Sequence, residues 1–367
     1  MAKKINSVNT LKSDKQSCFI YADTCVGFIN YFENLYISQN LEKIYIIKSP
    51  TDFGILNEIA KKAENKKYSV EYLLYPSDLN RLNGIILKEL KIAVVNENIC
   101  SNIFSCPAIV ENIINFNDFY DGNKLNESKN KLLELMVKKE EYKNSAYKFF
   151  KAANELRENI CEISKRYINH EKLNSSIERL TKKHVNEKRL HEFNESKNEY
   201  RFINAMSSIG NVELDTFEAE AKKIFYISNE NGLGWHYTEK IAKKFDFACK
   251  VICPDALNPI KIKAIYLVNS KILFVIKNKI PGKIYNDKYN FININRFSSN
   301  ELKKENKQKL RFLHKFYNAI ISETVKHFKE IESTTSEIEK IYESSLDSNK
   351  KNEKNKYTEA IIKKILP

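Results

Sequence analysis

The clearest chemical pattern in the chain lies at residues 229–236, between an apolar run and a helical pattern. A phosphate-binding loop, G-x-x-x-x-G-K-[S/T], occupies this kind of place, because its backbone N–H groups and the start of the following helix surround phosphates. The lysine of that motif contacts the β and γ phosphates, and its hydroxyl residue holds magnesium. In this chain Gly234 keeps its position, but Trp235 replaces the lysine and His236 replaces the hydroxyl residue.

These replacements remove the electrostatics of the motif. Tryptophan carries no charge, so charge-assisted bonds worth about 1.5–3 kcal/mol each are absent. Glu230 adds repulsion, and magnesium prefers oxygen ligands to the imidazole of His236. We therefore predict no catalytic residues, no metal site and no required cofactor. Trp235 is expected to fill the vacated space, with stacking on a base as the alternative. The segment is interpreted as a vestigial phosphate loop made of Asn231, Gly232, Leu233, Gly234, Trp235 and His236.

A second loop, at residues 48–56, departs further from the motif. It retains one glycine, and Pro50 removes a backbone donor where donors are needed. The acidic residue that holds magnesium at the end of a later strand is also missing from both places, where Asn96 and Ile276-Lys277 stand. Both magnesium positions and both phosphate loops are thus degenerate.

The two loops belong to an internal repeat, residues 44–98 and 224–278. Matching segments lie between 178 and 182 residues apart, which indicates tandem domains. Short apolar runs alternate with helical segments in each copy and predict an α/β fold whose mainly parallel sheet is covered on both faces. The predicted strands are 45–47, 70–74 and 92–95 in the first copy, and 225–227, 249–252 and 272–276 in the second. The matched segments include Lys43-Ile44-Tyr45-Ile46-Ile47 with Lys223-Ile224-Phe225-Tyr226-Ile227, and Pro76 with Pro254.

Each copy ends in a strongly helical stretch, residues 129–165 and 302–344, with further helical segments at 171–192 and 357–365. We expect these helices to pack on their own sheet; pairing with each other or with a partner protein is the alternative. The domain boundary is placed within 193–200, which gives repeat 1 at residues 1–196 and repeat 2 at 197–367, each with a helical extension.

The chain resembles a family of bacterial proteins described as ATPases, in which two P-loop NTPase domains lie in tandem. The resemblance covers nearly the whole chain and is strongest over residues 42–120. Typical members have a loop like G-x-P-G-T-G-K-S-T in each half and an aspartate where Asn96 stands. The resemblance implies two three-layer α/β/α domains and an ancestral ability to bind ATP. The similar stretches are Tyr75-Pro76-Ser77-Asp78, Leu82-Asn83-Gly84-Ile85-Ile86, and residues 89–95 and 107–116.

Composition adds few constraints. The formal charge is +14, and residues 251–300 carry eight basic and two acidic side chains, so the lysines of 251–311 could attract a nucleic acid. Seven cysteines without a C-x-x-C pair fit reduced thiols, and no apolar run reaches the length of a membrane span. We expect a cytoplasmic protein without a membrane partner.

Other polar residues are assigned structural roles. Five histidines, His170, His184, His191, His314 and His327, lie in charged helical segments that suit packing. Asp78 and, near the equivalent position, Asp255 are expected to cap helices.

Three functional hypotheses follow. The first is a pseudo-enzyme: a degenerate tandem P-loop-like scaffold that binds a protein partner or regulates, without ATP hydrolysis. The second is a protein that binds ATP weakly through Gly232, Leu233 and Gly234, or an ATPase with a non-standard loop. The third is a basic scaffold for nucleic acid.

Overall fold

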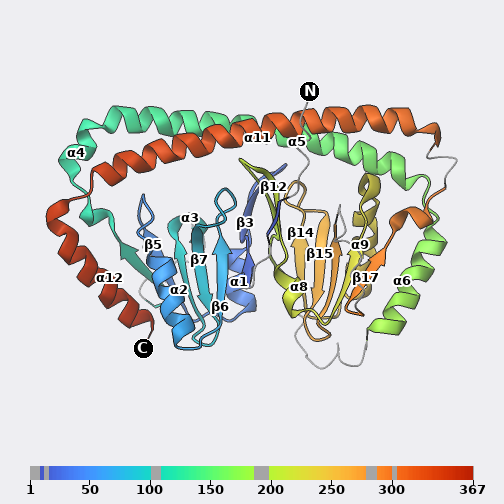
Figure 1. Cartoon of the computed structure of the whole chain (residues 1–367), viewed down its shortest axis with the longest axis horizontal. Coiled ribbons are helices and arrows are strands. Elements are labelled where there is room, and N and C mark those ends of the chain that lie inside the picture. The colour runs from blue at the N-terminus through green and yellow to red at the C-terminus, as the bar shows by residue number, and fades with distance from the viewer. Residues whose placement is uncertain are drawn as a thin grey trace.

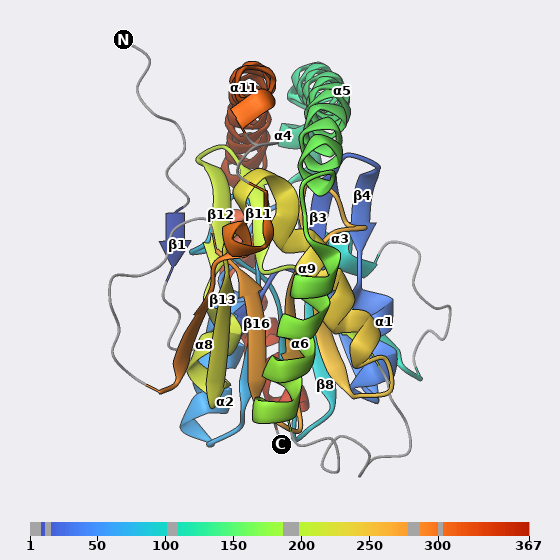
Figure 2. The same cartoon turned by 90° about the vertical axis from the view of Figure 1, so that its right-hand side faces the viewer.

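The computed structural model describes residues 9–11, 16–100, 109–185, 198–277, 287–299 and 304–366. Two six-stranded sheets stand side by side beneath a pair of long helices that run across both of them (Figure 1). Viewed from the side, the two long helices lie next to each other above the sheets (Figure 2). The described part of the fold is therefore α/β, with most strands in each sheet parallel.

The sheet of repeat 1 has the strand order β2-β6-β7-β8-β5-β9. All neighbouring strands are parallel except at β7, which is antiparallel to both β6 and β8. The strands are β2 (Ser17–Cys18), β5 (Lys43–Lys48), β6 (Val70–Leu74), β7 (Leu82–Leu87), β8 (Ile92–Asn96) and β9 (Glu111–Asn115).

The sheet of repeat 2 has the corresponding order, β10-β14-β15-β16-β13-β17, and β15 is again antiparallel to its neighbours. The register of β13 on β16 matches that of β5 on β8, and a register shift falls at the same place in β6 and β14. These correspondences confirm the internal repeat. The strands are β10 (Glu199–Tyr200), β13 (Lys223–Ile227), β14 (Lys250–Pro254), β15 (Ile262–Leu267), β16 (Ile272–Ile276) and β17 (Tyr289–Ile292).

The sequence analysis did not identify the antiparallel strands β7 and β15. Asn83, Gly84 and Lys263 interrupt the apolar pattern of these strands, yet all three are buried. Gly84 is required by close packing, because a Cβ there would lie 2.7 Å from Cγ1 of Val95. The polar residues are tolerated because they find partners, as described below.

Helices cover both faces of each sheet. Side chains alternate between the faces of a strand, so Ile44 and Ile46 of β5 pack toward α1, while Tyr45 and Ile47 pack toward α2. In repeat 2, α8 and α9 cover the equivalent faces. The shorter helices are α1 (Phe32–Ser38), α2 (Ile55–Asn65), α3 (Glu97–Cys100), α4 (Gly122–Glu127), α8 (Thr216–Glu220) and α9 (Leu233–Lys244), with the 3-10 turns η1 (Asn117–Phe119), η2 (Glu230–Gly232), η3 (Ile294–Phe297) and η4 (Ser348–Lys350).

The long helices α5 (Lys129–Lys165) and α11 (Lys307–Ser344) carry each repeat's extension onto the other repeat. After α5, helix α6 (His170–His184) packs on the sheet of repeat 2, where Leu173 and Ile177 join Phe225. After α11, helix α12 (Lys351–Ile365) packs on the sheet of repeat 1, where Ile361 and Ile365 join Tyr45. Figure 1 shows α12 on the flank of β5 and α2, and α6 on the flank of α9 and β17.

The expectation that each helical extension packs on its own sheet is therefore wrong. The long helices α5 and α11 pack mainly on each other, which was the alternative, and α6 and α12 pack on the sheet of the other repeat. The backbone shows the same exchange, because Tyr120 of repeat 1 forms an antiparallel bridge with Leu346, and Ser298 of repeat 2 forms one with Ile168. An amphipathic pattern identifies the buried face of a helix but not the sheet that covers it.

Equivalent residues meet where the two repeats adjoin, as they do on the axis of a symmetric dimer. Phe19 and Phe202 exchange two backbone hydrogen bonds of 2.9 Å, and the rings of Phe150 and Phe328 lie 5.6 Å apart where α5 and α11 cross. Two hairpins flank this region. They are β3 (Tyr21–Thr24) with β4 (Gly27–Asn30), and β11 (Asn204–Ser207) with β12 (Gly210–Leu214), the latter extended by β1 (Asn9–Leu11).

Candidate functional site

The segment interpreted from the sequence as a vestigial phosphate loop lies at the carboxyl edge of the second sheet, between β13 and α9, below α5 and α11. Ligands of α/β proteins bind at this edge. Asn231 and Gly232 both adopt left-handed conformations, with φ of 52° and 82°, which turn the chain into the helix. The predicted segment is thus a strand, a tight turn and a helix.

The loop satisfies its own donors. The side-chain oxygen of Asn229 accepts the backbone N–H of Gly234 at 3.0 Å, which is one of the groups that a phosphate would need. Gly234 is packed closely, because a Cβ there would lie 2.8 Å from the carbonyl oxygen of Ser228. The glycine therefore serves the close packing of the loop on itself.

Side chains from both long helices contact the turn from above. Cys161 of α5 lies so close to Gly232 that a Cβ on the glycine would be 2.0 Å from its sulfur. His314 of α11 contacts the side-chain oxygen of Asn231 through Nε2 at 2.8 Å. The space over the turn is occupied by protein side chains, with little room left for a triphosphate.

Trp235, which the sequence analysis expected to fill the space of a missing phosphate, is buried beneath α5. Its ring centre lies 4.5 Å from the guanidinium carbon of Arg157. This places a cation over an aromatic face, which is a favourable electrostatic contact. The same guanidinium pairs with Asp255 through Nη1 at 2.6 Å. Burial acts to raise the pKa of Asp255, but Arg157 and Lys263 outweigh it and hold that pKa below its usual value.

His236 is half-buried and points its ring at His170, with ring centres 5.4 Å apart. Burial, with contributions from Lys240 and His170, lowers the pKa of His236 to about 4. The imidazole is therefore neutral near pH 7. Among the described residues no group of three or more His, Cys, Asp or Glu side chains could hold a metal ion.

The loop of repeat 1 is closed by different residues. The carboxylate of Asp52 accepts the backbone N–H of Gly54 at 2.7 Å, at the start of α2. Arg81 lies 3.8 Å from Asp52 and pairs with Glu339 of α11 at 2.5 Å. Two carboxylates thus stand where an anion would approach. Thr51 also bonds the hydroxyl of Tyr120 at 2.6 Å.

Neither later strand presents a free carboxylate for magnesium. Asn96 at the end of β8 donates to the side-chain oxygen of Asn83 at 3.2 Å. Lys277 directly follows β16 and pairs with Asp215 at 2.6 Å and Glu218 at 3.2 Å. Burial raises the pKa of Glu218, with Lys277 acting in the opposite direction. The sequence analysis noted Lys277 but did not anticipate its acidic partners.

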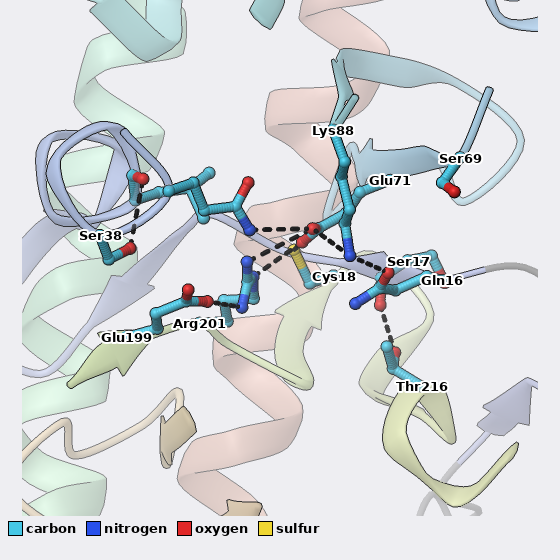
Figure 3. A network of polar contacts seen from close by, with 12 residues as sticks. Gln16, Ser17, Cys18, Ser38, Ser69, Glu71, Lys88, Glu199, Arg201 and Thr216 are labelled. Carbon is cyan, nitrogen blue, oxygen red and sulfur yellow. Dashed lines mark hydrogen bonds and ion pairs between the residues drawn. The ribbon is translucent and has the colours of Figure 1, made fainter. Parts of the chain in front are cut away.

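A second polar network, also missed from the sequence, joins the two repeats (Figure 3). Glu71 of β6 pairs with Arg201, which follows β10, at 2.7 Å, and both side chains are almost fully buried. Lys88 lies 3.6 Å from Glu71, and Glu199 lies 2.5 Å from Arg201. The signal in the sequence was the charge of Glu71 and that of Arg201, each placed among apolar residues. A charged side chain needs a partner when it is buried.

The strand registers also correct the pairing of the two acidic turn residues. The register shifts one residue before the end of β6 and of β14, so the residues that follow these strands, Tyr75 and Asp255, are equivalent. Three residues further on, Asp78 therefore corresponds to Asn258 and not to Asp255. Asp78 and Asn258 each accept a backbone N–H two residues ahead, at 3.0 and 3.1 Å, and thus cap turns, whereas helix capping was expected.

Several lysines of 251–311 are unavailable to a nucleic acid. Lys261 pairs with Glu158 at 3.1 Å, Lys263 pairs with Glu213, and Lys277 is paired as described above. His191 and Cys106 lie outside the described residues, as does part of the predicted helix 171–192.

No family model, curated protein or solved structure matches this chain. Among the described helices, none combines the length and the apolar character that crossing a membrane requires.

Proposed function

We propose that this protein is a degenerate member of the tandem P-loop NTPases that has become a non-hydrolysing binding or regulatory scaffold. The observation that carries this proposal is the contact of Cys161 and His314 with the turn at Asn231 and Gly232. A phosphate group bound there would have to displace side chains from both long helices.

The energetics of the two loops support the same proposal. Binding of a triphosphate requires donors and positive charge, but the N–H groups of Gly54 and Gly234 are already bonded to side chains of the loops. In repeat 1, the cation at the equivalent place, Arg81, is already paired with the carboxylates of Asp52 and Glu339. The two halves thus oppose nucleotide binding in different ways.

Equilibrium binding of a fluorescent ATP analogue, with and without magnesium, tests the proposal. We expect no magnesium-dependent saturation. The matched variant restores the lysine and the hydroxyl residue of the motif and removes the covering sulfur: Trp235→Lys, His236→Ser and Cys161→Ala together. Saturable binding by the wild-type protein at about 1 µM, equivalent to about −8 kcal/mol, would contradict the proposal.

The nucleic-acid alternative needs a separate measurement. Binding through surface lysines would weaken steeply as salt rises, because condensed counterions are released from the nucleic acid. The ion pairs of Lys261, Lys263 and Lys277 favour the protein-scaffold hypothesis over this alternative.

A further inference from the structure

A separate cavity of about 350 Å³ lies at the junction of α5 and α6, where these helices meet η3 of repeat 2. This volume is in the range of small-molecule sites, about 300–1,000 Å³. Its rim includes Arg166 and Lys172 from the extension of repeat 1, and Arg296 and Ser298 from repeat 2. The cavity therefore exists only because the extension of one repeat reaches the other.

Backbone hydrogen bonds fix the two sides of the cavity against each other. The N–H of Asn169 donates to the carbonyl of Phe297 at 2.7 Å, and the N–H of Ser299 donates to the carbonyl of Tyr167 at 2.8 Å. The side chain of Asn169 then accepts the N–H of Lys172 at 2.9 Å and starts α6. The cavity is thus built on ordered backbone.

The side chains around the cavity are suited to an anion. Three cations line it, no carboxylate does, and none of the three has an ion-pair partner among the described residues. Arg296 donates to the neutral hydroxyl of Ser176 at 2.8 Å and lies 4.6 Å from the ring centre of Phe297, so its guanidinium is positioned while its charge stays uncompensated. The hydroxyl oxygen of Ser298 is buried, and no hydrogen-bond partner for it is present in the described part of the chain.

The equivalent place in repeat 1 does not carry this charge. The backbone bridge is the same, between Tyr120 and Leu346. By the repeat spacing, however, Ser344 stands in place of Arg166 and Asp118 in place of Arg296. Lys350 remains, but it donates to the carbonyl oxygen of Asp118 at 2.7 Å. The basic character therefore belongs to one side and is not a by-product of the architecture.

We propose that this cavity binds a small anion that carries a phosphate group, held by Arg166, Lys172 and Arg296 with the hydroxyl of Ser298 as a further donor. Arginine forms paired hydrogen bonds with phosphate oxygens, and the start of α6 adds partial positive charge. This site goes beyond the proposed scaffold function and is independent of the loop at Gly232. A nucleic-acid strand could offer the same chemistry, and the experiment separates the two sources.

The experiment is a calorimetric titration of the full chain with inorganic phosphate and with pyrophosphate. We expect one saturable site. The variant Arg166→Gln/Arg296→Gln should weaken binding by about tenfold or more. The control Lys350→Gln/Lys351→Gln removes the same charge from repeat 1 and should leave the affinity unchanged. Absence of saturation up to about 10 mM, or an equal loss in the control, would overturn the proposal.

Two further measurements test the remaining explanations. Lys172→Gln changes an exposed side chain and should weaken binding even if Arg296→Gln disturbs folding through Ser176. A single-stranded oligonucleotide that displaces pyrophosphate and binds more tightly, with steep salt dependence, would overturn the small-molecule assignment. Because ATP also carries phosphates, the nucleotide titration is repeated on Arg166→Gln/Arg296→Gln, so that binding in this cavity is distinguished from binding at Gly232.

Discussion

The two repeats close the equivalent edges of their two sheets with different kinds of side chain. In repeat 1 the loop before α2 is covered by charges, with Asp52, Arg81 and Glu339 in a row. In repeat 2 the loop before α9 is covered by a sulfur and by the ring of Trp235 under Arg157. The backbone register that the repeats share thus specifies the place of a site but not its chemistry.

The junction between the repeats shows the same principle. Arg201 occupies the position of Cys18, and Glu71 occupies the position of Val251, so a charged pair forms only because the copies differ. Phe19 and Phe202, by contrast, are the same residue in both copies and meet each other. The contact between the equivalent residues Phe19 and Phe202 aligns the two repeats, and the ion pair between the non-equivalent residues Glu71 and Arg201 stabilises this one arrangement.

The largest expected effect comes from breaking that asymmetric pair. Arg201→Met leaves Glu71 buried without its main partner and should lower the free energy of unfolding by about 3–5 kcal/mol. The double variant Glu71→Leu/Arg201→Met should recover much of this loss, because no uncompensated charge remains. Urea denaturation of the wild type, both single variants and the double variant gives the coupling energy. Additive losses would show that the pair is not coupled.

The same variants carry a pH signature. Burial acts to raise the pKa of Glu71, but the charges of Arg201 and Lys88 outweigh it and lower that pKa from its usual value of 4.5. The ion pair of Glu71 and Arg201 therefore stabilises the fold fully at pH values above 4.5. Its contribution is lost as the pH falls through the lower pKa that Glu71 has in the folded state. The urea midpoint of the wild type should fall more steeply below pH 4.5 than that of the double variant. Parallel pH profiles would contradict this assignment.

An intermediate effect should distinguish the two turns. Gly54 has φ of 70° and no atom within 4 Å of the position that a Cβ would take, so Gly54→Ala should cost only the left-handed strain, about 1–2 kcal/mol. Gly232→Ala meets Cys161 as well and should cost about 3 kcal/mol in total. Thermal unfolding checks both. Adding Cys161→Ala should reduce the cost of Gly232→Ala toward that of Gly54→Ala, with only the ring of Trp235, 3.1 Å from the new Cβ, still in close contact. No such rescue would mean that α5 does not cover the turn.

The smallest effect concerns the side chains that cap the two loops. Asn229→Ala and Asp52→Ala each remove an acceptor from a backbone N–H and should cost about 1 kcal/mol. Only the stability lost in Asp52→Ala should become smaller at high salt, because the carboxylate of Asp52 also interacts with Arg81 and salt screens that interaction. Urea midpoints at low and high salt measure this, and Asp52→Asn serves as the control that keeps an acceptor. Equal salt dependence in both loops would remove the electrostatic distinction between them.

Much of the sheet was predictable because its strands are continuous apolar runs. The segments at β5, β6, β8, β13, β14 and β16 were all expected, and the long helices were expected within a few residues. The sequence analysis missed strands β7 and β15 because Asn83 and Lys263 interrupt the apolar pattern of these segments. Their partners, Asn96 and Glu213, come from other strands and cannot be inferred from local sequence.

The candidate site was predictable in part. Residue types alone predicted that Trp235 could not hold a phosphate, and the structure buries this side chain at the start of α9. What covers it could not be predicted, because Arg157 and Cys161 belong to the extension of the other repeat. Contacts between residues so distant in sequence depend on the path of the whole chain.

The exchange of helical extensions also sets the order in which the halves can be completed during synthesis. The sheet of repeat 2 receives α6 from residues made before it, whereas the sheet of repeat 1 must wait for Ile361 and Ile365, which are made after both sheets. Lys66 even bonds the carbonyl of Leu366 at 3.3 Å. The half that the ribosome makes first is thus the half that is finished last, because part of one apolar face of its sheet stays uncovered until α12 has been made.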